Sequence, residues 1–179
     1  MVRRLAICTL TFAALTAAAP ARAGSSLTVE ALGGFQSYRH PATQAGAADF
    51  VRDATGLLGG TALARIEGFG FGVGVDKTFN SGGPAPWAGW IMAGALIDPL
   101  PSLRVELLGE LGRRGGSSFD DIFRSGAGTF VGFRPGVSFR LLPSPIRVGV
   151  SGFSRWPTSN GEFGNPDLGL VGRVGIEFG

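Results

Sequence analysis

The sequence predicts an all-β protein, an eight-stranded antiparallel up-and-down transmembrane β-barrel. Three observations predict it. Apolar residues alternate with polar residues or glycine at period two through many short stretches. Eight such stretches have roughly the 9–11 residues that a tilted strand needs to cross a bilayer. The connections between them alternate between long and short, as in a barrel with loops at one rim and turns at the other.

The composition fits one apolar, glycine-rich domain. The chain has 179 residues, of which 31 are glycine and 16% are charged, and its mean hydropathy is +0.25. After residue 25 no unbroken apolar run reaches the roughly 18 residues that a membrane-spanning helix needs. Glycine costs about 1 kcal/mol relative to alanine inside a helix, so its abundance disfavours long helices and leaves strands possible.

Residues 1–23 are predicted to be a cleaved signal peptide, and residues 24–179 the barrel domain. Arg3 and Arg4 precede the apolar stretch Leu5–Ala19, and Ala21-Arg22-Ala23 forms an A-x-A cleavage site. An N-terminal membrane anchor is the alternative. It is disfavoured because the stretch is short and Pro20 interrupts it.

Removing the signal peptide changes the charge balance and the cysteine content. The chain has 16 basic and 13 acidic residues, and three of the basic ones (Arg3, Arg4, Arg22) lie in the signal peptide, which leaves 13 of each. A nucleic-acid partner is therefore not expected, because phosphate binding needs clustered positive charge. The only cysteine, Cys8, also lies there, so the mature protein can form no disulfide. A lipoprotein reading of Cys8 is disfavoured because the apolar stretch follows it.

The eight predicted strands and their connections follow from this alternation and from the turn residues. The strands are Leu27–Tyr38, Thr55–Ile66, Gly68–Phe79, Trp87–Ile97, Ser102–Arg113, Gly128–Leu142, Ile146–Trp156 and Leu168–Phe178. Longer loops are expected at Arg39–Ala54, Asn80–Pro86, Arg114–Ala127 and Pro157–Asp167, and short turns near Glu67-Gly68, Asp98–Pro101 and Pro143–Pro145. An even strand number places both chain ends at the short-turn rim, which would face the periplasm.

The polar positions of the strands carry arginines and carboxylates in equal number, and nearly all their other residues are Gly, Ser or Thr. A water-exposed face usually carries many lysines, but the only lysine, Lys77, lies elsewhere. The guanidinium group of arginine can donate two parallel hydrogen bonds to one carboxylate, and this compact pairing suits a crowded enclosed space. An eight-stranded barrel has an interior that side chains just fill. We therefore predict an internal ion-pair network, in place of an apolar core, with apolar residues facing lipid. Its predicted members are Arg65, Arg104, Arg134, Arg140, Arg147, Arg173, Glu30, Glu67, Asp76, Glu106, Glu110 and Glu177.

Aromatic residues near the predicted strand ends are consistent with girdles at the two membrane interfaces. These residues are Trp87, Trp90, Trp156, Tyr38, Phe79 and Phe178.

These features together resemble the small OmpA/OmpX-type outer-membrane β-barrel proteins. The resemblance covers Gly24 to Gly179 and rests on the signal peptide, the eight alternating strands, the loop asymmetry and the amphipathic last strand, Leu168–Phe178. It implies a bacterial outer-membrane location and insertion by the barrel-assembly machinery, which usually reads a terminal aromatic residue. Here Phe178 is followed by Gly179, so the chain departs from that ending.

Some barrels of this class act on lipid A, and such an activity needs a nucleophile and a base within hydrogen-bond reach of each other. The lone histidine, His40, has no local nucleophile, and a solvated loop position is favoured over a general base. The segment around Ser159 resembles the lipid A deacylase barrels. Those have a histidine two residues before a Ser-Asn pair, and here that position is Pro157, so no catalytic role transfers to Ser159.

Two other patterns are interpreted as structural. Gly70–Gly74 superficially resembles a nucleotide-binding loop, but it lies within a predicted strand with no helix after it. Asp120-Asp121 and the pair Asp49 and Asp53 could touch a divalent cation, but loop carboxylates are usually solvated. No cofactor, metal or catalytic residue is predicted.

The sequence favours a non-enzymatic, monomeric outer-membrane barrel with a structural, envelope-integrity or surface-interaction role. The expected partners are outer-membrane lipid and lipopolysaccharide. Two alternatives stay open: a lipid A-modifying enzyme, and a soluble lipocalin-like periplasmic binding barrel. The second would need its apolar residues inside and its charged residues outside.

Overall fold

The computed structural model describes residues 24–41, 50–79, 85–124, 127–159 and 162–179. The predicted signal peptide lies outside these residues. The strands are β1 (Ser25–Pro41), β2 (Phe50–Ile66), β3 (Phe69–Phe79), β4 (Trp87–Leu100), β5 (Leu103–Arg114), β6 (Gly128–Arg140), β7 (Ile146–Ser159), β8 (Glu162–Phe163) and β9 (Asp167–Phe178). A 3₁₀ helix, η1 (Phe119–Phe123), lies between β5 and β6. Among the described residues no helix is long and apolar enough to cross a membrane.

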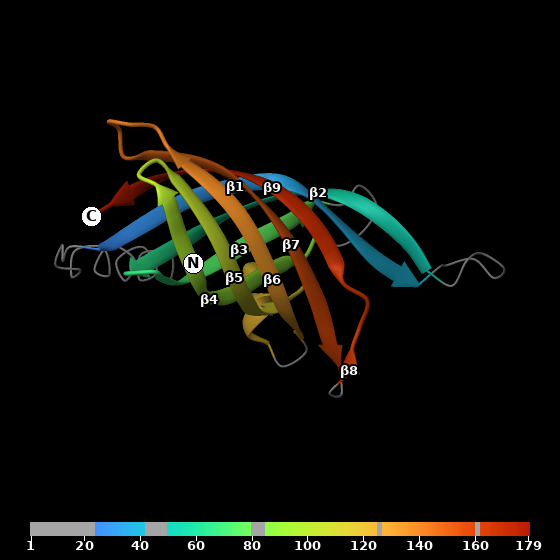
Figure 1. Cartoon of the computed structure of the whole chain (residues 1–179). Coiled ribbons are helices and arrows are strands. Elements are labelled where there is room, and N and C mark those ends of the chain that lie inside the picture. Colours follow the sequence, from blue (N-terminus) through green and yellow to red (C-terminus); the bar gives the residue numbers. More distant parts are fainter. Residues whose placement is uncertain (1–23, 42–49, 80–84, 125–126, 160–161) are drawn as a thin grey trace.

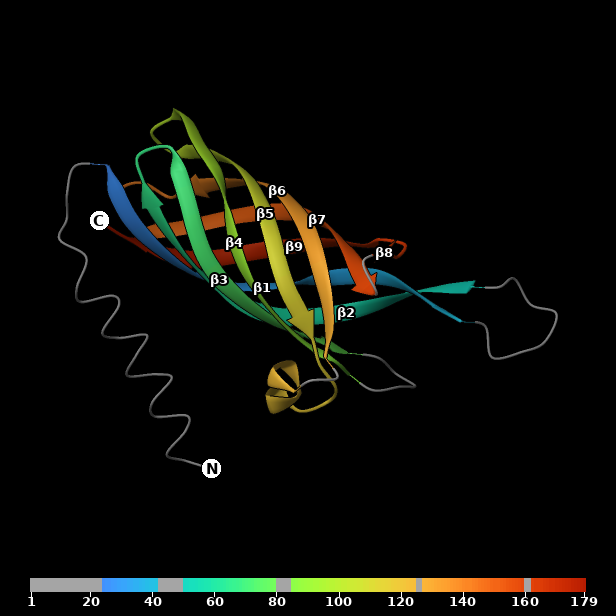
Figure 2. The ribbon, with the colours of Figure 1, turned by 90° about the horizontal axis from the view of Figure 1, so that it is seen from below.

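Eight long strands close into one antiparallel barrel (Figures 1 and 2). Each strand pairs with its sequence neighbour, the β6–β7 and β7–β9 pairings continue the wall, and β1–β9 closes it. The two-residue β8 pairs only with the end of β7. The predicted fold class, an eight-stranded antiparallel up-and-down barrel, is therefore confirmed.

The strand register gives the barrel its stagger. Hydrogen-bonded partners followed once around the wall from Leu27 return to β1 at Ser37, ten residues further along. With strands about 4.8 Å apart and a rise of about 3.3 Å per residue, this stagger corresponds to a tilt of about 40°. Because the strands are tilted in this way, residues that are distant in sequence lie at the same height inside the barrel.

The first hairpin is longer than the sequence predicted. The expected loop Arg39–Ala54 is partly strand, because β1 and β2 remain paired up to Pro41 and Phe50. Backbone pairing needs no apolar side chains, so strand continues where the apolar alternation has ended. The two strands project beyond the rest of the barrel (Figures 1 and 2).

The side chains have an inside-out arrangement. Leu107, Phe139 and Ile176 are 41%, 48% and 45% exposed on the outer face, whereas Arg134 and Glu106 are each 2% exposed inside. Along β9 the alternation is complete from Asp167 to Phe178. A membrane barrel needs this polarity, with apolar residues outward and polar residues in the lumen.

The interior also contains apolar side chains, which corrects the prediction of a network in place of an apolar core. One cluster joins Leu63, Ala88, Trp90, Met92, Leu96, Leu108 and Phe130, and a second joins Leu32, Leu57, Phe153 and Val171. Trp90 was expected in an interfacial girdle, but it is 4% exposed and points inward. Its neighbours along β4, Gly89 and Ile91, take the outward positions, because side chains of a strand alternate.

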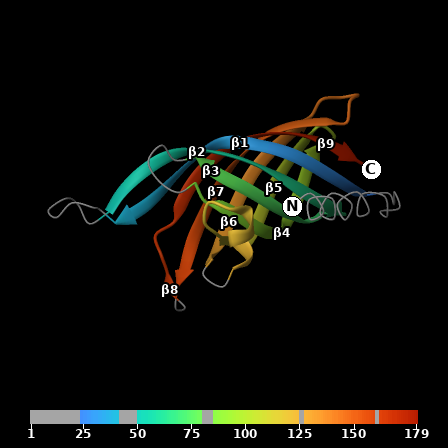
Figure 3. The ribbon, with the colours of Figure 1, turned by 180° about the vertical axis from the view of Figure 1, so that it is seen from behind.

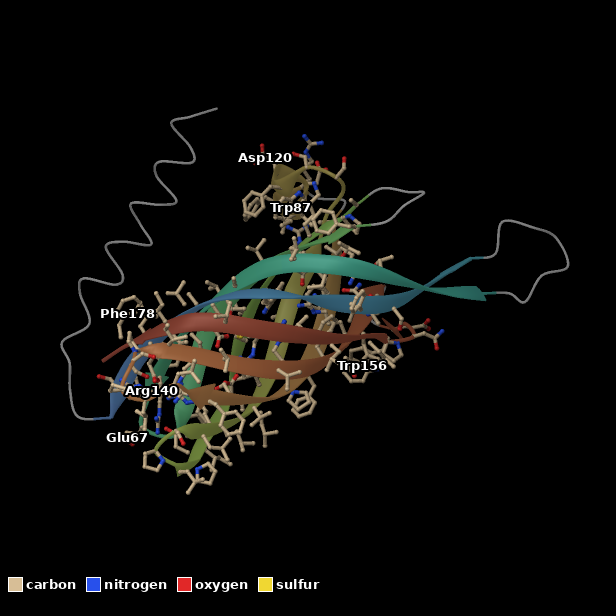
Figure 4. The ribbon with its side chains drawn as sticks, turned by 90° about the horizontal axis from the view of Figure 1, so that it is seen from above. Glu67, Trp87, Asp120, Arg140, Trp156 and Phe178 are labelled. Carbon is tan, nitrogen blue, oxygen red and sulfur yellow. The ribbon has the colours of Figure 1, made fainter. Side chains whose placement is uncertain are left out.

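The two rims of the barrel differ. Glu67, Arg140 and Phe178 lie at one end and Trp87 and Asp120 at the other (Figure 4). The first end carries the short turns between β2 and β3, β4 and β5, and β6 and β7. The second end carries the longer connections and η1 (Figure 3). Ser25 and Phe178 begin and end the barrel at the short-turn rim, as the even strand number predicts.

Candidate functional site: the charged interior of the barrel

Buried arginines and carboxylates fill the interior in three layers along the barrel axis. Each layer is built from inward positions of several strands, and small residues beside them leave the space that the long side chains need. At Gly132, for example, a Cβ atom would lie 3.1 Å from Oε2 of Glu110 and 3.2 Å from Cγ of Arg155. Glycine at inward positions therefore makes room for arginine on the neighbouring strand.

The layer nearest the short-turn rim is centred on Glu177 of β9. Its Oε1 accepts hydrogen bonds from Nη2 of Arg104 at 2.6 Å and from the Ser26 hydroxyl at 3.0 Å. Its Oε2 accepts one from Nε of Arg147 at 2.8 Å. Arg104 also donates from Nε to Asp98 at 3.0 Å. Five strands, β1, β4, β5, β7 and β9, are thus tied together at this end.

The middle layer is centred on Arg173, also of β9. Its Nη1 donates to Oε2 of Glu106 at 2.7 Å and to Oε2 of Glu30 at 3.0 Å. Ser138 donates to Oε1 of Glu106 at 3.0 Å and accepts from Nη1 of Arg147 at 3.1 Å. The serine therefore connects the middle layer with the layer nearest the short-turn rim.

The third layer, toward the long-loop rim, is centred on Arg155 of β7. Its Nη1 donates to Oδ2 of Asp76 at 2.8 Å, and its Nε donates to Oε2 of Glu110 at 2.8 Å. Nε of Arg134 donates to Oε1 of the same Glu110 at 2.6 Å. Arg155 is fully buried. The two carboxylates, Asp76 and Glu110, thus balance the charges of the two buried guanidinium groups.

Aromatic rings enclose Arg155. Its Cζ lies 4.1 Å from the ring centroid of Trp90, 4.5 Å from that of Phe153 and 5.0 Å from that of Phe130. A guanidinium group within about 6 Å of an aromatic ring is attracted by the electrons of the ring face. Charge pairing and ring packing together fill this level of the lumen.

Arg155 was missed by the sequence analysis, although its position carried a signal. It has the same parity along β7 as the predicted Arg147. The inward positions between them are Gly149, Ser151 and Phe153. Phe153, which directly precedes Arg155 on this face, is apolar and 3% exposed, so it interrupts the polar pattern before Arg155. Asp98, Asp167 and Arg114 were also not predicted. The last two form a pair of 2.6 Å near the long-loop rim.

Nine of the twelve predicted network residues lie buried in the layers. Two more lie at the short-turn rim. Arg65 is paired with Asp98, and Arg140 is 35% exposed with its Nη1 3.9 Å from Glu177.

Glu67 differs from the prediction. It is exposed in the turn between β2 and β3, where its φ is +56°. Its backbone carbonyl, and not its carboxylate, accepts a hydrogen bond of 2.6 Å from Nε of Arg65. The chain reverses at this residue, so the strand alternation that predicted an inward side chain no longer applies there.

The residues considered for catalysis or metal binding belong to several different elements, and among the described side chains none of them is a member of the three charged layers. His40 and Ser159 lie near the far ends of β1 and β7, in stretches whose side chains the structure does not describe. Gly70–Gly74 lies within β3, an antiparallel strand, so the nucleotide-loop reading fails. Asp120 and Asp121 belong to η1, Asp53 pairs through its backbone with Tyr38, and Asp49 falls outside the described residues. Within the described ranges no group of three or more His, Cys, Asp or Glu side chains could hold a metal ion.

Comparison with solved structures finds this fold at low sequence identity. Neisserial surface protein A matches with a TM-score of 0.58 and 14% identity, over 87% of this chain and 100% of that chain. The N-terminal β-barrel domain of Pseudomonas aeruginosa OprF matches with a TM-score of 0.61 and 12% identity, over 87% and 100%. Ail, the attachment invasion locus protein of Yersinia pestis, matches with a TM-score of 0.53 and 15% identity, over 88% and 100%.

At these identities the similarity concerns the fold, which is that of the small eight-stranded outer-membrane barrels. The resemblance drawn from the sequence is confirmed at that level. No protein-family model matches the sequence, and no curated protein matches it.

Proposed function

We propose that this protein is a non-enzymatic outer-membrane barrel whose filled interior makes it a stable, closed scaffold for surface loops. The observation that carries the proposal is the inside-out polarity, with paired charges within and an apolar outer wall. Because buried unpaired charge is costly, the pairing favours a rigid barrel and leaves little space for ions to pass. In this proposal the chain is exported by its signal peptide, inserted by the barrel-assembly machinery and functions as a monomer.

Two measurements test the location and the closed lumen. Processed protein should be recovered with the outer-membrane fraction and should migrate faster on a denaturing gel before boiling than after it. In planar bilayers the purified protein should give no large, stable single-channel conductance. Recovery in the soluble periplasmic fraction would contradict the location, and a steady open channel would contradict the closed lumen.

A surface-interaction role is the finer part of the proposal. It is supported by the asymmetry of the rims, since the longer connections and η1 gather at one end. Two proteins with this fold are named as a surface protein and as an attachment invasion locus protein. Deleting the gene and measuring both envelope leakage and attachment to host surfaces would test whether the role is structural or adhesive.

The two alternatives are less well supported. A soluble lipocalin-like barrel needs an outer face that water can cover, whereas here Phe71, Ile91 and Leu170 are 46%, 59% and 60% exposed on it. A lipid A deacylase needs a base beside its nucleophile, and Pro157 stands where those barrels have histidine. Altered lipid A in cells overproducing the wild type, and not in cells producing His40→Ala or Ser159→Ala, would favour the enzyme.

A further inference from the structure

The outer wall of the barrel carries an apolar groove of about 690 Å³ that spans β1 to β6. Its floor is made of small outward residues, Ala62, Ala64, Ala93 and Gly109, and bulky residues such as Phe71 and Ile91 flank them. The strand register pairs Ala93 with Gly109 side by side, and Phe71 of β3 lies between Ala93 and Ala64. A volume of this size is in the range of pockets that bind small ligands.

Cationic and aromatic side chains stand at the long-loop end of this groove, on the same outer face. Arg113 is the next outward residue of β5 after Leu111, and Lys77 is the second outward residue of β3 after Val73. Asp76 and Thr78 are buried on the opposite face, so Lys77 points outward. Its Nζ lies 5.4 Å from the ring centroid of Trp87, the paired residue on β4.

The 3₁₀ helix η1 folds against the outer wall at this same level. The Cβ position of Gly89, an outward residue of β4, lies 3.5 Å from Cδ1 of Ile122. Phe119 packs edge-on against Trp87 with ring centroids 5.4 Å apart, and Phe123 is 72% exposed. Exposed aromatic rings beside lysine and arginine are typical of the headgroup level of a membrane.

The spacing of the charges and the groove matches a lipid. Arg113 and Lys77 lie two and four residues beyond the groove residues of their strands, which at the strand tilt of about 40° corresponds to about 5 Å and 10 Å along the barrel axis. The headgroup region of a leaflet extends about 5–8 Å beyond the hydrocarbon core. Within the described residues no carboxylate forms an ion pair with Lys77 or Arg113, whereas Asp121 is paired with Arg124 at 3.1 Å. Nη2 of Arg113 donates to the backbone carbonyl of Arg124 at 2.6 Å, so its charge is positioned at this rim and is not neutralised by a carboxylate in the described part of the chain. Both positive charges are therefore available to an anionic headgroup.

We infer that this groove and its cationic end form a binding site for a phosphorylated, acylated glycolipid of the lipid A type. An acyl chain would lie over the alanine and glycine floor, and a phosphate would contact Lys77 and Arg113. The inference rests on the proposed outer-membrane location, because there the long-loop rim faces the leaflet that contains this lipid.

Native mass spectrometry of the detergent-purified full chain tests the inference, with lipid A, dephosphorylated lipid A and phosphatidylglycerol as separate probes. The wild type should retain lipid A more strongly than either other probe. Each cation near a membrane surface contributes about a five-fold increase in affinity, so Lys77→Gln/Arg113→Gln should weaken lipid A binding on the order of 25-fold. Binding of the dephosphorylated lipid should hardly change. Arg140→Gln, a charge removal at the opposite rim, is the control.

A second variant tests the groove. Ala93→Leu/Gly109→Leu fills the floor and should abolish retention of both forms of lipid A, whereas Ala31→Leu, an outward alanine of β1 away from the lining, should not. Equal retention by the wild type and all variants would overturn the site. A dimer that disappears in Ala93→Leu/Gly109→Leu would also overturn it, since a second copy would then occupy the groove. Heat-modifiable migration of each folded protein separates these outcomes from failure of the membrane-barrel proposal itself.

Discussion

Arg155 on β7 and Asp76 on β3 meet across the full width of the barrel, with Nη1 of the arginine 2.8 Å from Oδ2 of the aspartate. Four strand-to-strand steps separate β3 from β7 in either direction around the wall, so the two residues are attached to opposite walls. The pair acts as a crossbar, and Glu110 and Arg134 extend it.

Removing the arginine of this crossbar should strongly destabilise the barrel. Arg155→Ala leaves Asp76 buried and unpaired, and breaking one buried ion pair in this way costs about 3–5 kcal/mol. The urea midpoint for unfolding of the protein in lipid vesicles, followed by tryptophan fluorescence, measures the loss. Arg124→Ala is the control, because that side chain is 73% exposed. Equal midpoints for the two variants would refute a structural role for the crossbar.

Opening the level around Arg155 should create a conducting path. Arg155→Ala/Phe153→Ala removes two inward side chains of β7 that fill the lumen together with Trp90. We expect measurable single-channel conductance in planar bilayers, where the wild type has none. Phe133→Ala is the matched control, since Phe133 is an outward residue that is 45% exposed. A variant that stays non-conducting while folded would show that other side chains close the lumen.

Adding a side chain at an inward glycine should be far more harmful than adding one at an outward glycine. Gly132→Leu would push into Glu110 and Arg155, and overpacking of this kind costs about 1–3 kcal/mol. Gly172→Leu faces outward, and its Cβ would meet only the Gly33 carbonyl at 3.8 Å. The same urea titration should show a lower midpoint for Gly132→Leu and nearly no change for Gly172→Leu. The reverse order would mean that the inward and outward faces are assigned wrongly.

A charge on the outer wall should cost free energy according to its depth in the membrane. Leu107→Arg lies midway along β5 and should destabilise the folded protein in vesicles by about 2–4 kcal/mol. Leu142→Arg lies beyond the end of β6, at the short-turn rim, and should cost about 0–1 kcal/mol. Similar small costs at both positions would argue that water, and not lipid, surrounds the wall.

The sequence alone determined the fold class, because period two is a local property of a strand. The alternation in β3, β5, β6 and β9 assigned Phe71, Leu107, Phe139 and Ile176 to the outer face, where the structure places them. It also separated the short turns from the longer connections, since Gly and Pro mark turns through their own backbone preferences. The exact ends of β1 and β2 were not predictable, because strand pairing continues wherever two backbones stay side by side.

Only the tertiary structure decided which charges meet. Arg155 is 79 residues from Asp76, and their contact depends on the ten-residue stagger with which the wall closes on itself. A different stagger would keep every residue on its own face, inward or outward. It would change which residues of opposite walls lie at the same height along the barrel axis. Parity along a strand therefore fixes whether a side chain points in or out, whereas closure of the barrel fixes its partner across the lumen.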